Sequence, residues 1–198
     1  MARNTQPVLK RCRTLGVSPA VMGYSRTSNK NPGGQRRAKK SEYAPQLTEK
    51  QKVKFVYGIQ EKQFHAYYEK ASKMAGNTGE ELLCMIERRL DNVVYRLGFA
   101  STRREARQLV NHGHFTVNGK RVNIPSYLVK TGDVVAVCEK SCSNAFFKKL
   151  KEDDVFASTP KWLDRDKNTL TGKVIAAPAR EDIDFEIAEH LIVELYSK

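Results

Sequence analysis

The sequence lacks any apolar run that approaches the roughly 20 residues of a membrane-spanning helix. Its opening residues, MARNTQPVLKRCR, also lack the apolar core of a signal peptide. These absences argue against a membrane-spanning protein and against a secreted one. We therefore expect an intracellular protein.

Cysteine is scarce, and its spacing argues against a disulfide framework. The chain has four cysteines, Cys12, Cys84, Cys138 and Cys142. Cys138 and Cys142 could supply two zinc ligands, but a structural zinc site needs four, and no paired cysteine or histidine stands nearby. We expect free thiols, no bound metal and no cofactor.

Acidic residues are missing from the start of the chain, where the first is Glu42. Residues 1–40 hold ten lysines and arginines, whereas residues 151–198 hold eleven acids against seven basic residues. The whole chain carries a net charge of +13. Such an excess repels itself in a compact fold unless a polyanion neutralises it. Nucleic acid is the commonest polyanionic partner and an anionic membrane surface is the rival; we expect nucleic acid and no membrane.

Residues 1–41 form a basic arm rich in Gly, Ser, Asn and Pro. The arm has too few apolar residues to pack a core of its own, so we expect RNA phosphates to order it. The alternative is a solvated run of charge. The candidate RNA-binding residues of the arm are Arg3, Lys10, Arg11, Arg13, Arg26, Arg36, Arg37, Lys39 and Lys40.

Helical patterns follow the arm. Thr48 and Gln51 fit a capping box that starts a helix running to about Gly58. A second helix is predicted over residues 61–75, and Thr78 and Glu81 make another capping box. An apolar stripe continues to residue 97, as one helix or two, and Gly98 ends it. Three further candidate RNA contacts lie on the first helix: Lys50, Lys52 and Lys54.

Residues 102–121 carry the most informative pattern. Thr102 and Glu105 predict a helix start, and Asn118-Gly119 is a strong signal for a two-residue hairpin turn. At helical spacing the arginines lie beside the apolar face, and the turn folds the basic residues after it back toward the helix. We therefore predict one RNA-facing surface. Its candidate residues are Arg103, Arg104, Arg107, His112, Lys120 and Arg121.

The rest of the chain predicts further strands and a final apolar segment. Residues 133–139 suggest a strand, 143–151 a short helix, and 162–166 with 172–176 a second hairpin. The ending EIAEHLIVELYSK is apolar enough to need burial, and we expect it to pack on the helices of residues 48–90. The expected fold class is α+β.

Two sets of residues resemble known proteins. The stretch RLDNVVYRLGFASTRREARQLVNHGHFTVNGKRVNIPSYLVKTGDVVAV resembles a small RNA-binding module shared by one ribosomal protein, some pseudouridine synthases and tyrosyl-tRNA synthetases. The flanks MAR, EKQKVKFVYGIQEKQF, GNTGEELL and EHLIVELYSK resemble the family of protein four of the bacterial small ribosomal subunit. This second resemblance covers nearly the whole chain.

The resemblance implies a domain organisation. It divides the chain into the basic arm of residues 1–41, a helical domain of residues 42–90 completed by 181–198, and an inserted RNA-binding module of residues 91–180 with β-strands. Some members of the family carry a four-cysteine zinc site in the arm. This arm keeps only Cys12, so we expect no zinc there.

The resemblance also implies a function. Members are primary binders of small-subunit (16S-type) ribosomal RNA that hold a multi-helix junction and nucleate assembly of the subunit body. They lie beside the path by which mRNA enters, contact the fifth small-subunit protein and so bear on translational accuracy. Some repress their own operon by binding its messenger RNA.

Two alternatives use the same module. An RNA-modifying enzyme would need a catalytic domain, and Asp91 in RLDN superficially resembles a catalytic aspartate. Because no partner base or pocket is apparent, we interpret Asp91 as a helix-surface carboxylate that pairs with Arg88 or Tyr95, and we expect no catalysis and no small-molecule substrate. A free RNA chaperone would not need the flanking arm and helical domain.

Overall fold

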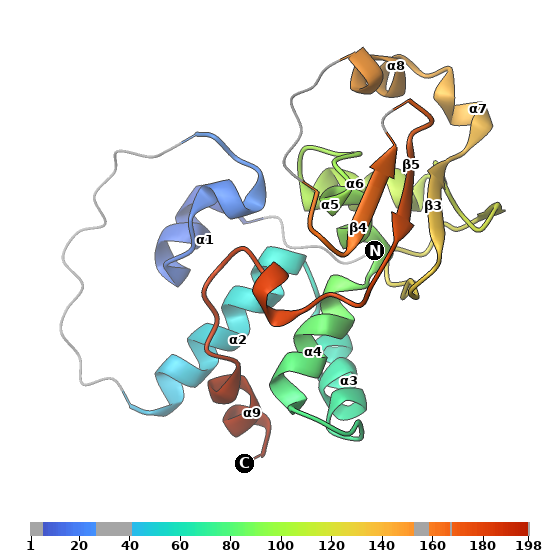
Figure 1. Cartoon of the computed structure of the whole chain (residues 1–198). Helices are drawn as coiled ribbons and strands as arrows, with labels where there is room; N and C mark the ends of the chain where they lie inside the picture. Colours follow the sequence, from blue (N-terminus) through green and yellow to red (C-terminus); the bar gives the residue numbers. More distant parts are fainter. Residues whose placement is uncertain (1–5, 27–40, 153–158, 167, 198) are drawn as a thin grey trace. The chain divides into compact units, whose positions relative to one another are not determined.

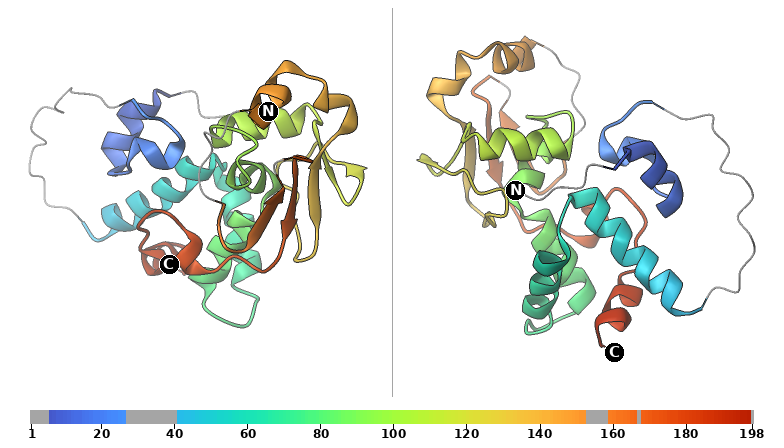
Figure 2. Two further views of the ribbon diagram at one scale, coloured as in Figure 1. Left: turned by 45° about the horizontal axis from the view of Figure 1, so that its top comes forward. Right: turned by 180° about the vertical axis from the view of Figure 1, so that it is seen from behind.

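The structure, a computed structural model, describes residues 6–26, 41–152, 159–166 and 168–197. It divides into two compact units. The first comprises the chain up to Leu82 together with Ile183 onward, and the second comprises Leu83–Asp182. Helices build the first unit, and a five-stranded antiparallel sheet with helices builds the second (Figures 1 and 2). The predicted α+β class is confirmed.

Helices from both ends of the chain form the first unit. Its elements are α1 (Val8–Leu15), the short 3-10 helix η1 (Pro19–Met22), α2 (Tyr43–Tyr57), α3 (Glu61–Ala71), α9 (Glu189–Ser197) and the first half of α4 (Thr78–Glu87). In Figure 1, α9 lies beside α2, although more than 130 residues separate them in the sequence. Ile192 of α9 is fully buried. The predicted packing of the C-terminal segment on the early helices is confirmed.

Tyr196 near the end of α9 fixes that helix to α3. Its ring centroid lies 4.8 Å from that of Tyr68 and 6.1 Å from that of Phe64. Its hydroxyl donates a hydrogen bond of 2.7 Å to Oε1 of Glu61. The tyrosine thus combines aromatic contact area with a polar bond to a carboxylate at the helix start.

The helix boundaries differ from the predicted ones. Helix α2 begins at Tyr43, five residues before Thr48, because the Thr48 hydroxyl donates to the Ala44 carbonyl within the helix instead of capping it. It ends at Tyr57, and Gly58, with φ of 64°, caps it close to the predicted end. Helix α3 ends at Ala71, not residue 75. The apolar stripe forms two helices, α4 and α5 (Leu90–Arg96).

The arm packs more than its composition predicts. Cys12 and Leu15, three positions apart on α1, are buried with Val17 and Met22. Helix α1 contacts α2, and Nη2 of Arg11 donates to the Gln51 side chain at 3.3 Å. The expectation that the arm lacks apolar residues for packing is wrong for residues 8–22, because its few apolar side chains fall on one face.

The second unit places helices against one face of the sheet. It contains α5, α6 (Arg103–Asn111), β1 (Phe115–Val117), β2 (Lys120–Arg121), β3 (Val134–Val137), α7 (Glu139–Cys142), α8 (Ala145–Glu152), β4 (Leu163–Asp166), β5 (Thr171–Val174) and the 3-10 helix η2 (Arg180–Asp182). The strand order is β2-β1-β3-β5-β4. Inward residues such as Phe115 and Val135 share a core with Leu97 and Phe147.

Both predicted hairpins form. Asn118 and Gly119 have φ values of 50° and 77°, the left-handed backbone that a two-residue turn of this kind needs. Thr116 and Val117 pair with Arg121 and Lys120 across the turn. Thr102 caps α6 as predicted, since its hydroxyl accepts from the Glu105 backbone N–H at 3.2 Å.

Candidate nucleic-acid interface

Five predicted RNA contacts fall outside the described residues. They are Arg3, Arg36, Arg37, Lys39 and Lys40. Their part in RNA binding stays a prediction. The remaining thirteen candidates lie in described parts of the two units.

Most basic residues in the described part of the arm are exposed, two of them on α1 and one beyond η1. Lys10, Arg13 and Arg26 are exposed, whereas Arg11 is half-buried against α2. Nε of Arg13 bonds the Leu9 carbonyl one helical turn back, at 3.4 Å. Packing of one face of α1 therefore leaves the basic face available to a polyanion.

The three candidate lysines of α2 form ion pairs with carboxylates of the same unit. Nζ of Lys50 lies 2.9 Å from Glu61, and Lys54 pairs with the other oxygen of the same carboxylate. Nζ of Lys52 lies 2.6 Å from Glu49. The structure thus brings Lys50 and Lys54 together, but RNA phosphate would have to compete with Glu61 for both.

Glu61 is the charged centre of this group. Burial raises its pKa, but hydrogen bonds from Lys54, Lys50 and Tyr196 outweigh that effect and lower the pKa to about 2. Burial and the bond to Glu61 both raise the pKa of Tyr196. The ionised carboxylate and the neutral phenol are therefore the stable forms across the ordinary pH range.

The Glu61 pairing predicts a pH-dependent stability. A carboxyl whose folded pKa is depressed stabilises the fold above its unfolded value near 4.5 and loses that effect as the pH falls toward 2. Because Glu61 is half exposed, solvent screening limits the effect to about 1 kcal/mol. We expect Glu61→Gln to lower the free energy of unfolding by that amount at pH 7.

Urea unfolding followed by circular dichroism at pH 7 and pH 3 checks this. The difference between wild type and Glu61→Gln should shrink at the lower pH. Glu69→Gln, which removes an exposed carboxylate on the same helix, should change stability by less than about 0.5 kcal/mol. A Glu61→Gln effect that is equal at both pH values would contradict the pairing.

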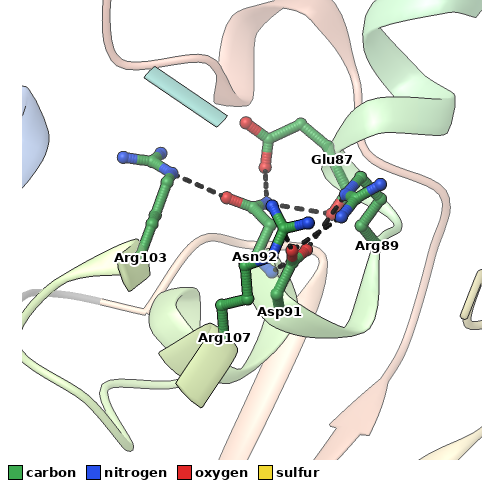
Figure 3. Close-up of polar contacts among 6 residues, drawn as sticks. All are labelled: Glu87, Arg89, Asp91, Asn92, Arg103 and Arg107. Carbon is green, nitrogen blue, oxygen red and sulfur yellow. Dashed lines mark hydrogen bonds and ion pairs between the residues drawn. The ribbon is translucent and has the colours of Figure 1, made fainter. Parts of the chain in front are cut away.

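Arg103 is not on the surface. The expectation that it lies beside the core is wrong: the residue is 6% exposed, and its Nε donates to Oδ1 of Asn92 at 2.9 Å (Figure 3). Its guanidinium carbon lies 4.4 Å from the centroid of the Tyr95 ring. The planar cation finds both a hydrogen-bond acceptor and an aromatic face inside the unit, which explains why it is buried.

Asp91 is buried rather than on a helix surface, and its partner is neither Arg88 nor Tyr95. It accepts from Arg89 at 3.0 Å and 2.7 Å, a two-bond pairing (Figure 3). Nη1 of Arg107 lies 4.0 Å from the same carboxylate. Asp91 is 4% exposed. Its burial between two arginines indicates a structural ion pair and not a catalytic carboxylate.

Asn92 links these contacts to the end of α4. Its Nδ2 donates to the Glu87 carbonyl at 2.9 Å and to the Glu87 carboxylate, which also accepts from Arg96 at 2.8 Å (Figure 3 shows all but Arg96). We name this set the arginine network. Its members are Glu87, Arg89, Asp91, Asn92, Arg96, Arg103 and Arg107.

The arginine network fixes α6 on α5 and has a net positive charge. Four arginines face two carboxylates in it, so the network carries two excess positive charges. Sequence reasoning singled out only Asp91, Arg103 and Arg107 and gave each another role. The spacing in ERRLDN was the available signal, but spacing alone does not show that side chains point inward.

Four of the predicted contacts in the second unit are exposed: Arg104, His112, Lys120 and Arg121. Arg121 reaches from β2 to the end of α6, where it donates to the carbonyls of Gly113 and His112 at 2.8 Å and 3.0 Å. The predicted return of the hairpin toward the helix is confirmed for this residue. Arg121 therefore joins β2 to the end of α6, whereas Arg103 and Arg107 are drawn into the arginine network, with Arg107 half-buried.

The arrangement suits binding of a polyanion. Exposed guanidinium and ammonium groups stand on a helix and a strand whose positions are fixed by packing and by the arginine network. Within the described ranges, no group of three or more His, Cys, Asp or Glu residues could hold a metal ion. No helix among those residues is long and apolar enough to span a membrane.

Comparisons with known proteins match two stretches of the chain to known families. Residues 88–135 match the family described as S4 domain, and residues 3–87 match the one described as Ribosomal protein S4/S9 N-terminal domain. Proteins named small ribosomal subunit protein uS4 match over their whole length and over all of this chain. The chain is 64% identical to that of Caldicellulosiruptor saccharolyticus, 63% to that of Caldicellulosiruptor bescii and 52% to that of Fusobacterium nucleatum.

Proposed function

This chain belongs to the family of small ribosomal subunit protein uS4, and from that membership we propose that it is a primary binder of small-subunit ribosomal RNA. As a member of the family it is a structural protein of the small ribosomal subunit and not an enzyme. A ribosomal protein of bacteria resides in the cytoplasm, with the ribosomes.

One observation carries the proposal: α6 and β2, which Arg121 links, both bear exposed basic residues. The exposed residues Arg104, Lys120 and Arg121 lie within the part that matches the S4 domain. Arginine grips phosphate with two parallel hydrogen bonds, and lysine adds a compact positive charge. Base edges of double-helical RNA are hidden in a deep, narrow groove. Recognition is therefore by the contour of an RNA junction and the position of its phosphates.

The same basic residues and the resemblance of the whole chain support a finer role. Binding naked RNA first would let the protein nucleate assembly of the subunit body. Contact with the fifth small-subunit protein, beside the path by which mRNA enters, would connect it to translational accuracy. The two-unit build supports this role, because each unit presents basic residues of its own.

Sedimentation tests the claim of primary binding. The purified chain, mixed with protein-free small-subunit RNA at moderate salt, should sediment with that RNA without any other ribosomal protein. Large-subunit RNA at equal mass is the control and should carry little of the chain. A chain that sediments with small-subunit RNA only after other proteins are added is not a primary binder.

A further inference from the structure

Two histidines and an arginine meet where α6 ends. The ring centroids of His112 and His114 lie 6.0 Å apart. Arg121 bonds the backbone carbonyls of His112 and Gly113 between them. His112 and Arg121 are exposed, and His114 is half-buried. Three groups that are cationic, or become so on protonation, therefore share one small site.

Gly113 makes room for this arrangement. Its φ is +72°, and a Cβ atom placed on it would lie 2.5 Å from Nε and Nη2 of Arg121. Any side chain at this position would displace the guanidinium from the helix end. Arg121 is thus held against the backbone by two hydrogen bonds, and Gly113 leaves the space that its guanidinium occupies.

The elements around His114 leave it in a positive environment. Nδ1 lies 2.9 Å from the Ser141 hydroxyl of α7, and the ring packs on Phe147 of α8 at 5.7 Å between centroids. Burial lowers the pKa of His114, and the charges of His112 and Arg121 lower it further. The charged residues next to these contacts along α7 and α8 are Glu139, Lys140 and Lys148.

We propose that His112, His114 and Arg121 form a seat for an RNA phosphate, and that protons taken up by the histidines strengthen its grip. The proposal rests on the function proposed above, because ribosomal RNA supplies the phosphate. Arg121 provides a permanent charge, and the imidazoles add charge when they are protonated. A phosphate between them relieves the mutual repulsion of the three groups.

The direction of the pH effect follows from the charges. In the free protein the positive neighbours and burial favour neutral His114. A bound phosphate brings negative charge and favours the protonated ring, so binding takes up protons. Affinity must then rise as the pH falls, by at most tenfold per pH unit for each proton taken up. From pH 7.5 to 6.0 we expect a rise of about three- to tenfold.

Equilibrium binding to small-subunit RNA at pH 7.5 and 6.0, at constant ionic strength, tests the seat. The variant His112→Gln with His114→Gln should lose most of the pH-dependent rise. His65→Gln, which removes an exposed histidine on α3, should keep it. Fluorescence of the buried Trp162 at both pH values shows whether the double variant is folded.

Inorganic pyrophosphate tests the same seat without RNA. Titration of the histidine ring protons by NMR should show a higher pKa for His114 when pyrophosphate is present, and the ring resonances of the exposed His65 should not respond to pyrophosphate. A pKa of His114 that pyrophosphate does not move, or a pH dependence that survives in the double variant, overturns the proposal. If wild type at pH 7.5 binds small-subunit and large-subunit RNA equally well, that result contradicts the proposed function instead. The pyrophosphate titration then decides whether the three residues bind phosphate.

Discussion

Asp91→Ala should lower the free energy of unfolding of the second unit by about 3–5 kcal/mol. The substitution leaves the guanidinium of Arg89, which is 0% exposed, without the carboxylate that accepts two of its hydrogen bonds. Breaking one side of a buried ion pair strands the other charge in a medium that solvates it poorly. Urea unfolding followed by Trp162 fluorescence reports on this unit, because Trp162 is the single tryptophan of the chain and lies in its core.

Two further variants show whether the loss of stability comes from the broken ion pair or from the loss of any negative charge. Asp164→Ala removes an exposed carboxylate from β4 of the same unit and should change stability by less than about 0.5 kcal/mol. Adding Arg89→Met to Asp91→Ala should recover part of the loss, since the stranded charge is gone. An Asp91→Ala protein as stable as wild type would mean that the network contributes nothing to the fold.

Reversing two exposed charges should weaken RNA binding about a hundredfold, or roughly 2.7 kcal/mol. The variant is Arg104→Glu with Lys120→Glu, one residue from α6 and one from β2, both exposed. Two lost phosphate contacts release fewer counterions, so the slope of log affinity against log salt should also become shallower, by about 1.8. Filter binding to small-subunit RNA over a salt series measures both quantities.

The control variant makes the same change in net charge at two other positions of the same unit. Lys161→Glu with Lys173→Glu reverses two exposed positive charges elsewhere in the same unit. It should leave the salt slope nearly unchanged and weaken binding far less. Equal losses in the two variants would show that only net charge matters and that α6 with β2 is not the interface. Trp162 fluorescence should be alike in both.

Local chemistry made much of the second unit predictable. The Thr102 cap and the Asn118-Gly119 turn depend on neighbouring residues only, and both form as predicted. Thr48 shows the limit of this reasoning. The same residue type bonds to the carbonyl four residues before it, and the choice between cap and helix interior depends on what packs around the helix.

The sequence indicated which elements carry exposed basic residues, but not the contacts that those residues make. Helical spacing placed Arg103 and Arg107 beside an apolar face, yet it could not show that Asn92 and Asp91 of a neighbouring helix would meet them. The pairing of Lys50 and Lys54 with Glu61 likewise depends on how α2 meets α3. These contacts come from tertiary packing, which periodicity does not encode.

The most direct test of the account is the affinity of the purified chain for protein-free small-subunit RNA, with large-subunit RNA as competitor, at physiological salt. The account predicts a preference of about a hundredfold or more for small-subunit RNA, because it proposes that basic residues held by the fold on α6 and β2 recognise the contour of one RNA junction. Equal affinity for the two RNAs would show charge attraction without recognition and would contradict the account.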